Sequence, residues 1–224
     1  MFSFLKEKKN KILKKAGFTI IEMLVVAAIF AILTAIIIFN YGNFTDNILA
    51  TNMAYEIGLV ARQAQVFGLG VRGTGGEFTN AYGIFVNLED GSSADGTKNI
   101  IFFVDNKPTD GNGECNDESG DSFCTCSTTD GLTDECLERL TLQRGIIING
   151  LFVKDEGGDC VFTNRLAVTF KRPNPDAIIV DQADHNIGFE LAEMQLFAPR
   201  SQSPRYVIVR NTGQISVDNQ SVCN

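Results

Sequence analysis

The chain holds a single histidine, His185, among its 224 residues. Nucleophilic catalysis by serine or cysteine commonly needs a histidine base within hydrogen-bond reach. Asp184 stands beside His185, but no serine or cysteine in a nucleophile context accompanies the pair. The glycines between residues 68 and 76 lack the lysine of a phosphate-binding loop, and no strand precedes them. The sequence therefore predicts a protein that is not an enzyme.

Charged residues are scarce and proline is absent between Phe18 and Gly70. From Phe18 to Phe39 there are 22 residues, of which Thr19, Glu22 and Thr34 are the only polar ones. A helix of this length extends about 33 Å, which is enough to cross a bilayer core of about 30 Å. No proline interrupts the chain before residue 70. We expect a transmembrane helix over residues 18–40 that sits in the lipid bilayer and continues as a helical stem over residues 41–70.

The residues before this apolar run set its expected orientation. Residues 1–17 contain six lysines and one glutamate, which gives the segment a charge of +5. Lysine-rich flanks stay on the cytoplasmic side of a membrane. The run is too long for a secretory signal peptide, and no small-x-small cleavage site follows it promptly. We therefore expect a single-pass protein of the cytoplasmic (inner) membrane, with its N-terminus in the cytoplasm and the rest of the chain outside.

One carboxylate, that of Glu22, lies inside the apolar run. A charged side chain costs roughly 2.5–3.5 kcal/mol at the centre of a membrane helix and less near its end. Such a residue indicates a function by default, and a partner for it is expected. A plain signal anchor explains the lysines and the span, but it explains neither Glu22 nor the glycine at position 17.

Ten residues at this junction closely resemble the N-terminal signature of type IV pilins and type II secretion pseudopilins: Gly17-Phe18-Thr19-Ile20-Ile21-Glu22-Met23-Leu24-Val25-Val26. The resemblance implies that a prepilin peptidase cuts between Gly17 and Phe18, which makes residues 1–17 a basic leader. It also implies that Phe18 becomes the N-methylated terminus and that Glu22 neutralises this amine on a neighbouring subunit during assembly. The implied partners are the peptidase, other pilin or pseudopilin subunits in a helical filament, and an assembly platform in the inner membrane.

The stem shows apolar residues at helical spacing, which predict the face that packs on the head domain. These residues are Ile48, Met53, Ile57, Val60, Ala61, Ala64 and Phe67. Gly68 and Gly70 supply a C-terminal stop for the helix.

After residue 70 the pattern changes from helical to extended. Eight short apolar segments predict strands: Tyr82–Leu88, Ile100–Val104, Arg139–Ile148, Leu166–Lys171, Ala177–Val180, Ile187–Phe197, Arg205–Arg210 and Gln214–Val217. Asn211-Thr212-Gly213 predicts a hairpin turn between the last two. A long helix followed by many short strands predicts an α+β fold, with a mostly antiparallel β head over residues 71–224. The last hairpin is similar to that of minor pseudopilins of the GspH/FimT type.

The head is expected to be stapled by disulfide bonds. All six cysteines lie after residue 114, which suits an oxidising compartment outside the cytoplasm: Cys115, Cys124, Cys126, Cys136, Cys160 and Cys223. Six cysteines allow 15 pairings, and the sequence does not choose among them. Because Cys223 is next to last, we expect it to tie down the C-terminus. A zinc cluster of the first four cysteines is the alternative, although their spacing does not match the close pairs of usual zinc sites.

A long acidic loop over residues 105–135 interrupts the predicted strands. It gathers hard oxygen ligands of the kind that calcium prefers. The candidate ligands are Asp105, Asp110, Asn112, Glu114, Asp117 and Asp121. The fit to a calcium loop is partial, because a cysteine stands where glycine is needed and aspartate replaces the final glutamate. The pseudopilin resemblance favours Ca²⁺ in such a loop, and a solvated acidic loop without metal is the alternative.

Net charge limits the functions open to the head. Removal of the +5 leader from a chain of net charge −8 leaves −13, which disfavours nucleic-acid binding. A DNA-uptake pilin that uses Arg200, Arg205 and Arg210 is one alternative, and a single-pass anchored receptor with a calcium-dependent binding domain is another. We favour a structural subunit, a minor pilin or pseudopilin of a type IV pilus or type II secretion-like filament, because of the acidic insertion and the C-terminal hairpin.

Overall fold

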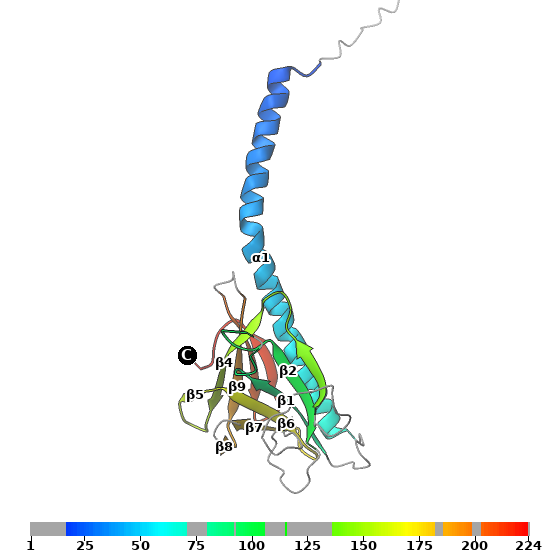
Figure 1. Cartoon of the computed structure of the whole chain (residues 1–224), viewed down its shortest axis with the longest axis vertical. Helices are drawn as coiled ribbons and strands as arrows, with labels where there is room; N and C mark the ends of the chain where they lie inside the picture. Colours follow the sequence, from blue (N-terminus) through cyan, green and yellow to red (C-terminus); the bar gives the residue numbers. More distant parts are fainter. Residues whose placement is uncertain are drawn as a thin grey trace, which may run out of the picture. The chain divides into compact units, whose positions relative to one another are not determined.

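The computed structural model describes residues 17–70, 80–91, 93–105, 115, 136–181, 186–198 and 203–223. These residues belong to two compact units, Met1–Gly42 and Asn43–Asn224. In the described part, the chain forms one helix, α1 (Ile20–Leu69), and eleven strands (Figure 1).

In the first unit, α1 begins at Ile20 because Thr19 caps it. The Thr19 hydroxyl oxygen accepts a hydrogen bond from the backbone N–H of Glu22 at 3.3 Å. The Thr19 carbonyl accepts one from the N–H of Met23 at 3.2 Å. Threonine at the N-cap with glutamate three residues later is the capping-box pattern, which satisfies N–H groups that a helix end leaves unpaired.

Every side chain from Phe18 to Phe39 is exposed within this unit. Helix α1, the one helix in the described part of the chain, is long and apolar enough to cross a membrane. An exposed apolar run of this length is costly in water, so this segment needs lipid or other protein around it.

The second unit combines the rest of α1 with two antiparallel sheets. The six-stranded sheet has the order β3-β2-β1-β6-β7-β8, and the five-stranded sheet has the order β11-β10-β9-β4-β5. Their strands are β1 (Ala81–Asn87), β2 (Asn99–Asp105), β3 (Cys136–Thr141), β4 (Ile147–Lys154), β5 (Cys160–Thr163), β6 (Arg165–Phe170), β7 (Ala177–Asp181), β8 (Asn186–Ile187), β9 (Leu191–Phe197), β10 (Arg205–Arg210) and β11 (Ile215–Asp218). The predicted α+β fold, a long helix with an antiparallel β head, is confirmed.

The main core of the second unit is one cluster to which α1 and both sheets contribute. On α1 its fully buried members are mostly alanines, at positions 50, 54, 61 and 64, with Ile57 between them. Small side chains let a helix approach a sheet closely, and alanine also has the highest helix propensity. The predicted buried face is therefore correct for Ile57, Ala61 and Ala64, and Met53, Val60 and Phe67 pack against the same core while partly buried. It is wrong for Ile48, which is exposed on the other side of the helix.

The end of α1 is held against the head by specific contacts. The ring of Phe67 packs edge-on to Tyr82, with centroids 5.8 Å apart. The amide of Gln65 donates hydrogen bonds to the carbonyls of Gly213 at 3.0 Å and Pro175 at 3.1 Å. At Gly68 a Cβ atom would lie 2.2 Å from the carbonyl oxygen of Phe170, so only glycine fits this approach of helix to sheet.

The predicted C-terminal hairpin is confirmed as β10 and β11. Gly213 takes a positive φ of 79° in the turn, and its N–H donates to the Arg210 carbonyl at 2.9 Å. Glycine adopts this backbone conformation without the steric penalty that other residues carry.

Two strand predictions need correction, and one strand was missed. The segment Arg139–Ile148 is not one strand, because Arg144 and Gly145 both have positive φ and turn the chain between β3 and β4. The segment Ile187–Phe197 divides into the end of β8 and all of β9. Strand β5 was not predicted at all, because it has only four residues.

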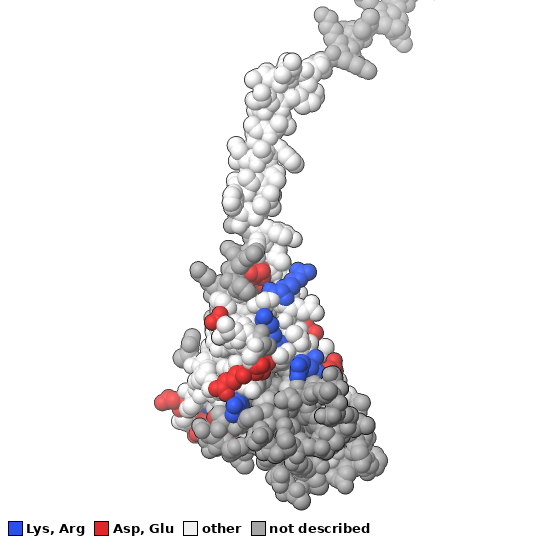
Figure 2. All heavy atoms as spheres, in the orientation of Figure 1, with Lys and Arg blue, Asp and Glu red and all other residues white. Residues whose placement is uncertain are grey.

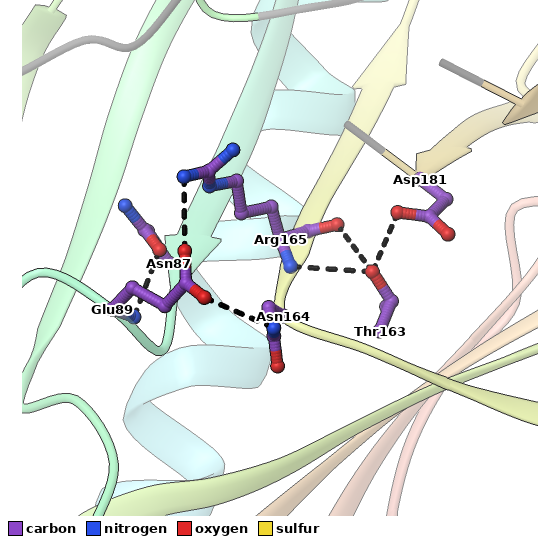
Figure 3. Close-up of polar contacts among 6 residues, drawn as sticks. All are labelled: Asn87, Glu89, Thr163, Asn164, Arg165 and Asp181. Carbon is purple, nitrogen blue, oxygen red and sulfur yellow. Dashed lines mark hydrogen bonds and ion pairs between the residues drawn. The ribbon is translucent and has the colours of Figure 1, made fainter. Parts of the chain in front are cut away.

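The chain passes from the five-stranded to the six-stranded sheet at Asn164, between β5 and β6, and polar contacts fix this crossing (Figure 3). The Thr163 hydroxyl donates to the buried Asp181 carboxylate at 2.5 Å. Arg165 forms an ion pair with Glu89 at 2.9 Å, and the Asn164 amide donates to the same carboxylate at 3.1 Å. These contacts join the crossing to the end of β1 and to β7.

Candidate assembly site

The predicted cleavage residues Gly17 and Phe18 lie directly before α1, and both are exposed. A Cβ atom added at Gly17 would meet nothing within 4 Å. Neither packing nor a close approach therefore requires glycine at this position. A glycine that the described fold does not need is consistent with recognition by another protein, because a protease reads residue identity at its cleavage site.

Glu22 lies in the first turn of α1 and is surrounded by exposed apolar side chains. It forms no ion pair with any residue that the structure describes. It is the one charged residue between positions 17 and 42, and Figure 2 shows this apolar segment as an uncharged surface on the face in view. A charge that leaves water without a partner is strongly destabilising, so its partner has to come from outside these residues.

The stem carries a second apolar face, which we call the outer stripe. It consists of Phe44, Ile48, Tyr55, Leu59 and Val66, with exposed fractions between 46% and 68%. Their spacing of four and seven residues places them on one side of the helix, opposite the alanines that face the core. Exposed apolar surface of this kind marks interaction sites in soluble proteins.

Sequence reasoning missed the outer stripe because α1 is apolar on both sides beyond the membrane segment. The signal that could have found it is the separation of alanines from larger apolar residues on the helical wheel. Four alanines occupy the side that a sheet can approach closely, whereas tyrosine, leucine and valine occupy the other.

The C-terminus is held by a disulfide bond and by a buried carboxylate. Cys160 and Cys223 are bonded, with 5.4 Å between their Cα atoms, so the predicted anchoring of Cys223 is confirmed. The Glu193 carboxylate, which is fully buried on β9, accepts hydrogen bonds from the Ser221 hydroxyl at 2.5 Å and the Val222 N–H at 2.6 Å. The Cys223 N–H donates to it as well, at 3.3 Å.

Tyr206 lies in the small apolar cluster that packs against Cys223. Burial raises the pKa of its phenol above the usual 10.0, and the negative charge of Glu193 raises that pKa further. A hydrogen bond with the Gln195 side chain acts in the opposite direction. The phenol is therefore held in its neutral form beside the C-terminal segment.

The structure describes only some of the predicted zinc and calcium ligands of the head. Cys115 and Cys136 are disulfide-bonded, which leaves no thiolate on either for a zinc ion, and Cys124 and Cys126 lie outside the described residues. Asp105 is buried at the end of β2. The other proposed calcium ligands, Asp110, Asn112, Glu114, Asp117 and Asp121, lie outside the described residues. Within the described part, no three potential metal-binding side chains gather.

The histidine and the arginines singled out in the sequence do not form one site in the described structure. His185 and Arg200 lie outside the described residues. Arg205 and Arg210 lie at opposite ends of β10. The Nε–H of Arg205 donates a hydrogen bond to the Thr51 hydroxyl oxygen on α1 at 2.9 Å.

The N-terminal part of the chain matches a known sequence motif. The prokaryotic N-terminal methylation motif matches residues 12–38, and this motif is the signature of type IV pilins and pseudopilins. The chain thus carries the N-terminal signature that its junction residues predicted. The motif implies processing by a prepilin peptidase and assembly with other pilins. No curated protein and no solved structure matches the chain.

Proposed function

We propose that this protein is a non-enzymatic building block, a minor pilin or pseudopilin, of a type IV pilus or type II secretion-like filament. The observation that carries the proposal is the isolated Glu22 carboxylate within the methylation motif, one turn from Phe18. Cleavage after Gly17 creates a positive amine on Phe18. The Glu22 of a neighbouring subunit neutralises that amine, and pairing offsets part of the desolvation cost that each charge bears alone.

The apolar helix serves two environments in turn. In the inner membrane it anchors the subunit, with the lysines of residues 1–17 in the cytoplasm and the head outside. Lipid gives such helices no hydrophobic reason to associate, whereas extraction into a filament buries their apolar surface against each other. The outer stripe offers further apolar surface on the stem for such contacts. The disulfide bonds of the head support an extracytoplasmic location, because disulfides persist in oxidising compartments.

The first experiment is intact and N-terminal mass spectrometry of the protein from native membranes. The proposal predicts a mature chain that starts at Phe18 and carries one added methyl group. A Gly17→Leu variant is the control, because nothing within 4 Å of position 17 opposes a side chain there, so the fold should tolerate it while cleavage fails. A wild-type chain that still begins at Met1 would overturn the pilin function and leave a membrane-anchored domain.

A further inference from the structure

A hollow of about 200 Å³ lies where the stem meets the start of β10. It is lined by Phe44, Asn47, Ile48, Thr51, Asn52 and Arg205. We call it the Arg205 socket. Two of its residues, Phe44 and Ile48, also belong to the outer stripe, so the socket is continuous with that apolar surface.

The guanidinium of Arg205 is fixed in this socket. Its Nε–H donates to the Thr51 hydroxyl oxygen at 2.9 Å, and Nη1 donates to the carbonyl of Pro204 at 3.0 Å. The Thr51 hydroxyl in turn donates to the Asn47 carbonyl at 2.8 Å, which sets its orientation. The arginine is thus held in place by backbone and hydroxyl groups, all of them neutral.

Arginine has five N–H donors, and these contacts use two of them. Among the described residues, Arg205 has no carboxylate partner. A planar guanidinium with free donors matches a carboxylate, with which it forms short, charge-assisted hydrogen bonds. The exposed Phe44 and Ile48 beside it suit an apolar side chain next to that carboxylate.

We propose that the Arg205 socket binds a carboxylate side chain of a second copy of this chain in the filament. The proposal rests on the proposed function, which places subunits side by side through their helices, and it requires that two such neighbours are copies of this chain. The socket adjoins the outer stripe, so a copy packed on the stripe also reaches the arginine. Charge complementarity supports the same occupant, because the mature chain has a net charge of −13 and offers carboxylates in excess. A fixed cation beside the stripe reduces repulsion between such copies and sets their register.

The test uses the full chain, produced in membranes together with a prepilin peptidase. A photo-crosslinking phenylalanine analogue replaces Asn52, which is exposed and lines the socket. Mass spectrometry then identifies the crosslinked peptide. The expected partner is a peptide of this same chain that contains Asp or Glu.

The crosslink is repeated with Arg205→Gln and with the matched control Arg210→Gln, which removes the same charge from the other end of β10. Loss of a hydrogen-bonded charge pair is expected to lower the crosslink yield roughly tenfold in the Arg205 variant. The control should keep its yield. Formation of the Cys160–Cys223 disulfide checks that both variants fold.

The outcomes separate the socket from the proposed function. Methylated Phe18 and a crosslink from Tyr55 on the outer stripe report assembly without the socket. If both are present but Arg205→Gln leaves the Asn52 crosslink unchanged, the socket proposal is wrong and the filament function stands. A crosslink to a different protein also overturns the second copy as occupant. If Phe18 is never exposed by cleavage, both proposals fail.

Discussion

The carboxylate of Glu193 accepts a hydrogen bond from the backbone N–H of Val222 at 2.6 Å, across 29 residues of sequence. Because Glu193 is fully buried, its oxygens can be satisfied only by such partners. A Glu193→Leu substitution would leave the Ser221 hydroxyl and the Val222 N–H without their acceptor, whereas the Cys223 N–H would keep the Ser221 hydroxyl oxygen at 3.0 Å. We expect it to lower the free energy of unfolding by about 1–3 kcal/mol.

Urea unfolding of the full chain in detergent, followed by tyrosine fluorescence, measures this loss. Glu138→Gln on β3 is the control, because Glu138 is exposed. An unchanged urea midpoint for the leucine variant would show that the C-terminal segment does not depend on Glu193.

Replacement of Glu22 by glutamine separates helix capping from charge pairing. The backbone bond of residue 22 to the Thr19 hydroxyl does not require a charged side chain, so α1 should still begin at Ile20. We expect normal cleavage and methylation but loss of filament incorporation, because the Phe18 amine would have no anionic partner. Mass spectrometry and recovery of sheared filaments measure the two steps. Filament yields equal to wild type would remove the assembly role from Glu22.

The outer stripe should matter for association and not for folding. Leu59→Glu places a charge on the most exposed residue of the stripe without removing a core contact. We expect the free energy of unfolding to change by less than about 0.5 kcal/mol, while crosslinking between copies falls sharply. Gln214→Glu, which adds the same charge in the C-terminal hairpin, should leave crosslinking intact. Equal crosslinking in both variants would exclude the stripe as an interface.

The disulfide bond between Cys160 and Cys223 closes a loop with a sequence separation of 63. In the chain-entropy account, such a closure stabilises the folded state by roughly 4 kcal/mol. The double variant Cys160→Ser, Cys223→Ser should therefore unfold at a clearly lower urea concentration. The double serine variant is preferable to a reducing agent, because reduction would also break the disulfides of Cys115 and Cys136.

The raised pKa of Tyr206 predicts a stability change at alkaline pH. Because the folded pKa lies above the unfolded value, the contribution is complete below pH 10 and is lost as pH rises through the folded pKa. Tyr206→Phe should therefore show a smaller fall in urea midpoint between pH 9 and pH 11 than the wild type. The exposed Tyr55→Phe is the control and should follow the wild type. Identical slopes for all three proteins would contradict the prediction.

Much of the fold could be predicted because its signals are local. The apolar run after Gly17, the helix end at Gly70 and the Asn211-Thr212-Gly213 turn each depend on neighbouring residues, whereas Gly68, predicted as part of the helix stop, lies inside α1 and is needed for its approach to Phe170. The break between β3 and β4 was missed because it depends on a positive φ at Arg144, a conformation that arginine rarely takes. Strand β5 was missed because four residues are too few to show alternation and, unlike the equally short β11, it is not marked by a predicted hairpin turn.

The site residues also fall into those that a local motif predicts and those that depend on tertiary packing. Gly17, Phe18 and Glu22 could be recognised because they form one short motif. The hydrogen bond from the Val222 N–H to the Glu193 carboxylate could not be predicted. The pattern of β9 does not reveal that a buried Glu193 meets a backbone donor 29 residues later. The orientation of Ile48 was also not readable, because the stem is apolar on both sides and only tertiary packing decides which side is covered.

The Cys160–Cys223 disulfide has a mechanical consequence for a subunit under tension. A chain pulled at its two ends can lengthen only along segments that are free to straighten. The disulfide bond carries the force past the residues between the two cysteines, which include β6 to β11, so these residues are not stretched. At about 3.4 Å per extended residue, the bond withholds roughly 200 Å of contour length from any stretching force. Unfolding of β1 to β4 by a pulling force would therefore stop at Cys160. The C-terminal hairpin would remain within the loop that the disulfide bond closes.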